Sequence, residues 1–116
     1  MSASLPASNY RELFLWLLGR RRRFRVTGPS MLPLLRPGEE VLVQAIAKDS
    51  QGPQAGEIVI ARHPDQPGLR LIKRVKAVDG GLYFLQGDND RESTDSRSFG
   101  AVPWEQILGK VTSRFP

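Results

Sequence analysis

Residues 69–86, LRLIKRVKAVDGGLYFLQ, decide the expected class of fold. The stretch predicts two strands, Leu69–Val78 and Leu82–Gln86, joined at Asp79-Gly80-Gly81 by a tight hairpin turn that needs positive φ. Further strand-like stretches lie between breaks rich in glycine and proline: Phe24–Thr27, Glu40–Ala45, Glu57–His63 and Leu108–Arg114. The chain is therefore expected to form a small, mainly β domain.

A short helix is expected before the strands. Asn9 can cap it, with Glu12 three positions on as in a capping box, and the helix should end near Leu18. Its last six residues, 13–18, are apolar on every side and therefore need a partner. Two partners fit: the domain's own core, or a membrane interface with the arginines of residues 20–25 on anionic head groups.

Length and composition are those of a single soluble domain. The 116 residues suffice for a helix with a basic segment, residues 1–23, and a β domain, residues 24–116. Hydrophobic residues at 40% and charged residues at 25% are typical of a globular chain that is neither disordered nor membrane-spanning. The apolar run at 13–18 is far shorter than the roughly 20 residues of a membrane-spanning helix. Arginines follow this run, so a secretory signal is not expected.

The positive charge is concentrated in one segment. The formal net charge is +5, and Arg20, Arg21, Arg22, Arg23 and Arg25 lie within six positions. This local basicity indicates a surface contact for that segment. Few aromatic residues interleave with the arginines, so nucleic acid is not the expected partner. We expect a cytoplasmic protein, either free or peripheral to the membrane through the N-terminal helix and Arg20–Arg25.

Metal and thiol chemistry are not expected. The chain has no cysteine, which excludes disulfides, thiolate zinc sites, iron–sulfur clusters and a cysteine nucleophile. His63 is the single histidine. Asp88, Asp90 and Glu92 alternate as in a calcium loop, but the EF-hand glycine at position six and glutamate at position twelve are absent. No metal or cofactor is therefore predicted.

Ser30 is a candidate nucleophile. It lies in Gly28-Pro29-Ser30-Met31-Leu32-Pro33, where the prolines constrain a loop that follows a strand. A fixed hydroxyl and a fixed backbone N–H are what a nucleophile and an oxyanion donor require. The alternative is an ordinary serine in a turn.

Lys73 is a candidate general base. With the period of two of a strand, it shares a face with apolar residues, whereas the neighbouring cations point the other way. Leu69, Leu71, Val75 and Ala77 lie on its own face, and Arg70, Ile72, Arg74 and Lys76 on the other. A buried lysine loses hydration, which lowers its pKa and favours a neutral amine. The alternative is a lysine at the core margin that extends its ammonium into solvent.

Residues 87–100 form a long polar segment without periodicity, which in a compact domain is usually functional. Ser93 can hold the lysine amine. Asp95 and Arg97 can pair and so fix the loop.

Together these segments resemble the characteristic boxes of the signal peptidase I family. The boxes are, in order, Ser30-Met31-Leu32-Pro33, Leu71-Ile72-Lys73-Arg74-Val75, Gly87-Asp88-Asn89, Ser93-Thr94-Asp95-Ser96-Arg97 and Phe99-Gly100. The resemblance runs from about Val26 to Lys110 and includes Pro37-Gly38-Glu39 and Glu57-Ile58-Val59. It implies a serine peptidase with a compact, antiparallel, β-barrel-like catalytic core and a Ser–Lys dyad.

The resemblance also implies roles for single residues. Ser30 is the nucleophile, and its backbone N–H contributes to the oxyanion hole. Lys73 is the general base, Ser93 orients its amine, and Asp95 and Arg97 support the site. The implied partner is a precursor protein bound as an extended peptide.

Several positions depart from the family pattern. Leu34 stands where threonine is usual, and Gly28 where some members have a serine that serves as an extra oxyanion donor. Val78-Asp79-Gly80-Gly81 replaces a Pro-Gly-Asp box. Residues 30 and 73 are only 43 positions apart, so the large inserted domain of longer members is not expected. Nor is their membrane anchor expected.

The short layout, with Trp16-Leu17-Leu18-Gly19 before the arginine run, is most similar to the nickel-type superoxide dismutase maturation proteases of bacteria. This similarity implies removal of an N-terminal leader from a precursor, with the nickel superoxide dismutase precursor as candidate. The alternatives are general signal-peptidase-like processing at the membrane surface, a Ser30–His63 pair with an acidic partner, a decayed peptidase acting as a scaffold, and a non-catalytic β domain that binds anionic lipid or nucleic acid.

Overall fold

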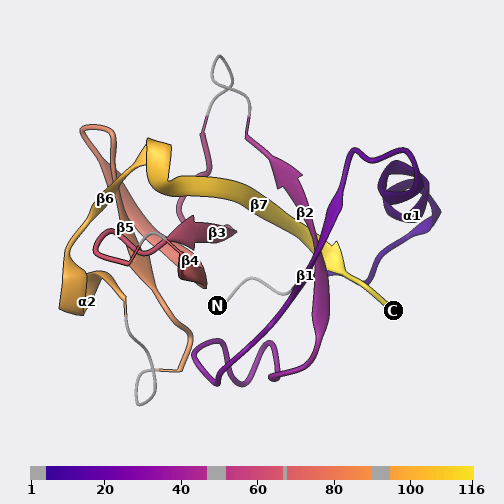
Figure 1. Cartoon of the computed structure of the whole chain (residues 1–116), viewed down its shortest axis with the longest axis horizontal. Helices are drawn as coiled ribbons and strands as arrows, with labels where there is room; N and C mark the ends of the chain where they lie inside the picture. Colours follow the sequence, from indigo (N-terminus) through magenta and orange to yellow (C-terminus); the bar gives the residue numbers. More distant parts are fainter. Residues whose placement is uncertain (1–4, 47–51, 67, 90–94) are drawn as a thin grey trace.

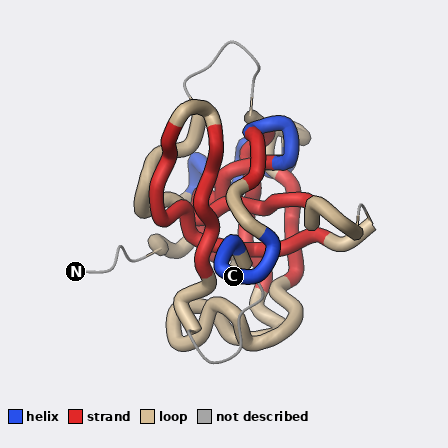
Figure 2. The backbone as a smooth tube through the Cα atoms, turned by 90° about the vertical axis from the view of Figure 1, so that its left-hand side faces the viewer, coloured by secondary structure: helices blue, strands red, loops and turns tan. Residues whose placement is uncertain are grey.

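The fold is mainly β, as the sequence predicted. The computed structural model describes residues 5–46, 52–66, 68–89 and 95–116. Within these ranges a seven-stranded antiparallel sheet, in the order β1-β2-β7-β3-β4-β5-β6, curls into a half-barrel with one helix beside its β1–β2 end (Figures 1 and 2). The elements are α1 (Tyr10–Leu17), β1 (Arg22–Arg25), β2 (Glu40–Ala45), β3 (Ile58–Arg62), β4 (Arg70–Asp79), β5 (Leu82–Gln86), α2 (Ser96–Phe99), β6 (Val102–Pro103), a 3₁₀ turn (Trp104–Gln106) and β7 (Ile107–Arg114).

The predicted strands are present with small changes at their ends. β2 and β5 have the predicted bounds, β3 and β4 differ by one residue at each end, and β7 begins one residue earlier than predicted. β1 is the exception, because it begins at Arg22 and ends at Arg25, two residues before the prediction at each end. Arg22 and Arg23 pair with β2, so the backbone of the basic segment is part of the sheet. The sequence did not predict these bounds, because the side chains of this strand are mostly charged and show no hydrophobic alternation.

Three short elements between β5 and β7 were missed: α2, β6 and the 3₁₀ turn. Residues 87–100 are not one continuous loop, because α2 lies within them with Asp95 as its N-cap. β6 follows and pairs with β5 through Val102 and Pro103. Elements of two to four residues are too short to show a periodic pattern.

β3 and β4 separate two apolar clusters. The first cluster contains Val26, Met31, Leu35, Val41, Ile58, Ile60, Ile72 and Val111, and the second Val59, Ala61, Val75, Tyr83, Leu85, Val102 and Ile107. β4 alternates between them as the period of two predicts. Both of its faces are buried near the middle, however, so Ile72 on the expected basic face lies in the core. The register between β4 and β5 shifts at a bulge between Val75 and Ala77, pairing continues beyond it, and Ala77 is exposed.

The inner side of α1 packs on the domain itself. Asn9 caps the helix by accepting from the Glu12 backbone N–H at 2.9 Å, as predicted. The Glu12 side chain instead points toward β7, where it accepts hydrogen bonds from Thr112 and Ser113, and it pairs with Arg21 at 3.0 Å. Its carboxylate therefore ties the helix to the sheet.

The outer side of α1 remains apolar and exposed. Tyr10, Phe14, Leu17 and Leu18 are between 57% and 92% exposed. Of the two partners expected for this helix, the domain core therefore accounts for one side only. Among the helices in the described ranges, none has the length and apolar character needed to cross a membrane.

Candidate active site

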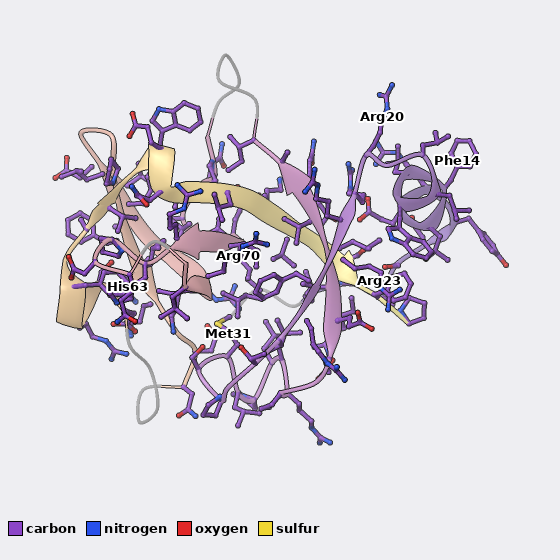
Figure 3. All side chains as sticks on the ribbon, viewed as in Figure 1. Phe14, Arg20, Arg23, Met31, His63 and Arg70 are labelled. Atoms are coloured by element: carbon purple, nitrogen blue, oxygen red, sulfur yellow. The ribbon has the colours of Figure 1, made fainter. Side chains whose placement is uncertain are left out.

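The loop that carries Ser30 is anchored on both sides of the serine. It follows β1, and Gly28 adopts a φ of +77°, which a residue with a side chain rarely takes. Immediately after Ser30, Met31 is fully buried in the first cluster and points into the interior of the molecule (Figure 3). Ser30 itself is half-buried. A fixed backbone with an accessible hydroxyl is the environment expected for a nucleophile.

Asn89 attaches this loop to the end of β5. Its side-chain amide donates to the Pro29 carbonyl at 3.0 Å, and its backbone N–H donates to the Ser30 carbonyl at 2.8 Å. Sequence reasoning placed Asn89 in a family box but assigned it no role. An asparagine three residues after the end of a strand, in a polar segment without periodicity, is the local signal of this contact.

A half-buried ion pair supports Asn89 from the neighbouring strand. Arg74 of β4 donates to both oxygens of Asp88, each at 2.9 Å, and to the Gly56 carbonyl at 2.7 Å. Such a bidentate pair fixes geometry as well as charge. The turn after β5, and with it Asn89, is therefore held against β4.

Lys73 lies at the centre of β4, opposite Val59 of β3, and only 2% of its surface is exposed. Burial lowers the pKa of the Lys73 amine. Asp95 acts in the opposite direction, and the positive charge of Arg97 lowers the pKa further, so that it lies below the usual lysine value. The prediction of a desolvated lysine on the buried face is confirmed.

Asp95 and Arg97 form the predicted pair. Asp95 is fully buried and accepts from the Arg97 guanidinium at 2.7 Å, while the Gly87 backbone N–H donates to it at 3.1 Å. Asp95 therefore joins the start of α2 to the end of β5. Ser93, the expected partner of the lysine amine, lies outside the described residues.

Ser30 and Lys73 line the same cavity. It has a volume of about 200 Å³ and extends between the loop after β1 and the first half of β4. Thr27, Gly28 and Pro29 line it on the serine side, and Leu69 to Ile72 on the other. The structure thus brings together two residues that are 43 positions apart in number and belong to different elements.

His63 lies elsewhere. It is buried, its ring packs edge-on against Phe99 with a centroid distance of 4.9 Å, and its Nδ1 accepts from the Asp65 backbone N–H at 3.1 Å (Figure 3). It is not among the residues that line the cavity of Ser30. The alternative Ser30–His63 pair is therefore not supported. Within the described ranges, no group of acidic and histidine side chains is arranged to hold a metal ion.

The family model described as signal peptidase, peptidase S26, matches residues 21–82 and 76–115. The chain belongs to this family. The match covers the serine loop, the lysine strand and the segment with Asp95 and Arg97 in the expected order.

Similar proteins are named as mitochondrial inner membrane protease subunits and as a signal peptidase. The mitochondrial ATP-independent inner membrane protease subunit 1b of Arabidopsis thaliana is 38% identical over 110 residues, which are 75% of this chain and 65% of that protein. The human mitochondrial inner membrane protease subunit 1 is 31% identical, covering 73% and 63%. A probable signal peptidase I-1 of Synechocystis is 25% identical, covering 78% and 68%.

The chain thus spans slightly less than two thirds of the first two relatives. The names of these relatives are those of inner membrane proteases and a signal peptidase, not of nickel-type superoxide dismutase maturation proteases.

Proposed function

We propose that this protein is a serine endopeptidase in which Ser30 is the nucleophile and Lys73 the general base. The observation that carries the proposal is that both residues line one cavity while Lys73 is 2% exposed and its pKa is lowered. A neutral amine can accept a proton, whereas the ammonium of an ordinary surface lysine cannot. Membership of the peptidase S26 family supports the same chemistry.

The reaction is acyl transfer in two halves. The Lys73 amine takes the Ser30 hydroxyl proton as that oxygen bonds to the scissile carbonyl carbon, and the resulting oxyanion accepts from the Ser30 backbone N–H. The lysine ammonium gives its proton to the leaving amine as the C–N bond breaks. Water then attacks the ester, lysine takes a proton from it, and that proton returns to the serine oxygen as the C–O bond breaks.

Asp95 and Arg97 support this cycle as a nearly neutral pair. Asp95 raises the pKa of Lys73 and Arg97 lowers it, so the net charge of the pair next to the amine is small. We propose that the Ser93 hydroxyl orients the amine.

The proposed substrate is a precursor protein, bound as an extended peptide, from which the enzyme removes an N-terminal leader. The nickel superoxide dismutase precursor is one candidate. The other candidate activity is general removal of leaders at a membrane surface, and the names of the relatives favour it.

The proposal is tested by incubating the purified protein with candidate precursors, including that of nickel superoxide dismutase, and sequencing new N-termini. Ser30→Ala should lower the cleavage rate by several orders of magnitude. Lys73→Arg should do the same, because a guanidinium does not become neutral. The matched control is Lys76→Arg, an exposed position on the same strand. Retained cleavage by Lys73→Arg would show that Lys73 is not the base.

We also propose that α1 binds an anionic membrane surface peripherally. Its outer face is apolar, and the adjacent Arg11 and Arg20 are exposed. Fewer arginines of the basic segment can bind lipid than the sequence suggested, because Arg21 pairs with Glu12 and Arg23 pairs with Glu40. Apolar side chains flanked by free arginines are typical of helices that lie in a membrane interface.

A further inference from the structure

A second hollow adjoins the cavity of Ser30 and Lys73. It has a volume of about 310 Å³ and lies on the face of the sheet that carries the first apolar cluster. Apolar side chains of four strands line it: Phe24, Val43, Ala45, Ile60 and Leu108. Four arginines complete the lining: Arg22, Arg23, Arg62 and Arg70. We refer to this hollow as the arginine groove.

Of the four arginines of the groove, only Arg23 has an ion pair among the described residues. Arg21, Arg23, Arg74, Arg97 and Arg114 each pair with a carboxylate. Among the described residues, no such ion pair involves Arg22, Arg62 or Arg70, and all three are exposed. The groove therefore carries positive charge that this part of the chain does not neutralise.

The strand register places two of these charges opposite each other. Arg62 of β3 and Arg70 of β4 are direct cross-strand partners. Like charges in this position destabilise a sheet. An anion bound between them would remove that repulsion. Two neighbouring arginines can bind a carboxylate through several hydrogen bonds.

The groove continues directly from the candidate active site. Phe24 and Arg70 line both hollows, so a peptide that passes Ser30 and Lys73 reaches the arginines without leaving the surface. Figure 3 shows Arg70 in the middle of the molecule, between the β1–β2 end and the β4–β5 end. The floor is apolar and the rim is basic, which fits an extended peptide with both apolar and acidic side chains.

We propose that the arginine groove is a substrate subsite that selects precursors carrying Asp or Glu at a fixed distance from the cut, on one side of it. This inference rests on the proposed peptidase function. In this proposal, the enzyme recognises an acidic side chain near the cleavage site, and Arg62 and Arg70 are the residues that bind it.

Cleavage-site profiling tests the proposal. The purified full chain is incubated with a diverse peptide library, and the cut sites are identified by mass spectrometry, with Ser30→Ala as the blank. Asp and Glu should be enriched at one or two fixed positions. For a peptide pair that differs only by Glu or Gln there, kcat/KM should favour Glu by about tenfold. Arg62→Glu should reverse this ratio, whereas Lys76→Glu, an equal charge change on an exposed β4 residue outside both hollows, should preserve it.

The outcomes separate the two proposals. Cleavage that depends on Ser30 but shows no acidic enrichment would overturn the groove assignment and leave the peptidase function standing. If no peptide is cut, the peptidase function fails, and binding then decides the groove. In that case the binding of an alanine-rich peptide with two glutamates to the Ser30→Ala protein is compared with that of its glutamine counterpart by fluorescence anisotropy, and equal binding would overturn the assignment.

A lipid head group is the competing occupant. Binding of phosphatidylglycerol vesicles is therefore measured for the protein with and without Arg62→Glu. Loss of vesicle binding with no change in the Glu-to-Gln ratio would assign the groove to lipid and overturn the peptide subsite. An altered ratio with unchanged vesicle binding would support it.

Discussion

At the scale of single residues, the position of Lys73 matters most. The amine loses hydration at the centre of β4, and this loss has the largest effect on its pKa. A solvated lysine loses its proton near pH 10.5. Because the pKa of Lys73 is lowered, its amine becomes neutral at a lower pH than that. The kcat/KM of the enzyme should therefore increase as pH rises through the lowered pKa of Lys73.

Replacing Arg97 should move that pH profile. Arg97→Gln removes a positive charge that lowers the pKa of Lys73, and it removes the ion pair of Arg97 with Asp95, the carboxylate that raises the same pKa. Both effects act in one direction, so the acid limb of the kcat/KM profile should shift to higher pH. The measurement is kcat/KM across the pH range for both proteins. An unchanged or acid-shifted limb would contradict the assignment of Lys73 as the titrating base.

Asn89 should affect catalysis only by positioning the loop that carries Ser30. In Asn89→Asp a carboxylate oxygen replaces the donor that faces the Pro29 carbonyl, so the hydrogen bond is lost and two acceptors face each other. The serine loop should move and kcat should fall about tenfold or more, because sub-ångström placement of a nucleophile controls rate. Steady-state kinetics measure this change, and thermal unfolding reports any loss of stability separately. A change confined to KM would argue against a positioning role.

At the scale of elements, α1 is joined to the sheet by one carboxylate. Burial raises the pKa of Glu12, but hydrogen bonds from Thr112 and Ser113 and the charge of Arg21 outweigh this effect, so the pKa lies below its usual value of 4.5. A carboxyl whose pKa is lower in the folded state stabilises the protein at pH values above its unfolded pKa. This contribution is lost as pH falls through the folded pKa.

Glu12→Gln should test that linkage. The neutral amide cannot pair with Arg21, so the free energy of unfolding at pH 7 should fall by about 1–3 kcal/mol. The variant should also lose less stability than the wild type as pH falls below about 4.5. Urea unfolding at several pH values measures both effects. Glu105→Gln, at an exposed position of the 3₁₀ turn, is the control and should change neither.

At the scale of the whole molecule, one apolar surface is left without a partner inside the described structure. The outer face of α1 lies at the end of the molecule where Phe14 and Arg20 project outward (Figure 3). Trp16, on the inner side, packs edge-on against Phe115 at 4.7 Å, and Arg23 lies over both rings. The inner side of the helix therefore packs against Arg23 and Phe115, while its apolar face points away from the sheet.

Binding to vesicles tests this surface. The double variant Phe14→Ser, Leu17→Ser should bind phosphatidylglycerol vesicles at least tenfold more weakly than the wild type, because each lost apolar side chain removes buried surface worth about 1–2 kcal/mol. Flotation through a density gradient measures binding. Phe84→Ser, an exposed aromatic on β5, serves as the control. Equal flotation of all three proteins would show that α1 does not contact lipid.

The sequence alone determined those features that depend on neighbouring residues. Strand alternation predicted β2, β5 and the burial of Lys73, and Asp79-Gly80-Gly81 predicted the hairpin, where Gly80 and Gly81 adopt φ values of +58° and +81°. Asn9 likewise caps α1 through a backbone N–H three residues away. These are local effects of side-chain periodicity, backbone freedom and hydrogen bonding, and they act within a few residues.

Only the tertiary structure decided which distant residues meet. Glu12 contacts Thr112 and Ser113, about a hundred residues later, and Asn89 holds the loop of Ser30. The arginine groove likewise depends on the register that sets Arg62 opposite Arg70. Such contacts follow from strand order and the curl of the sheet, which many weak interactions set together, so no short stretch of sequence encodes them.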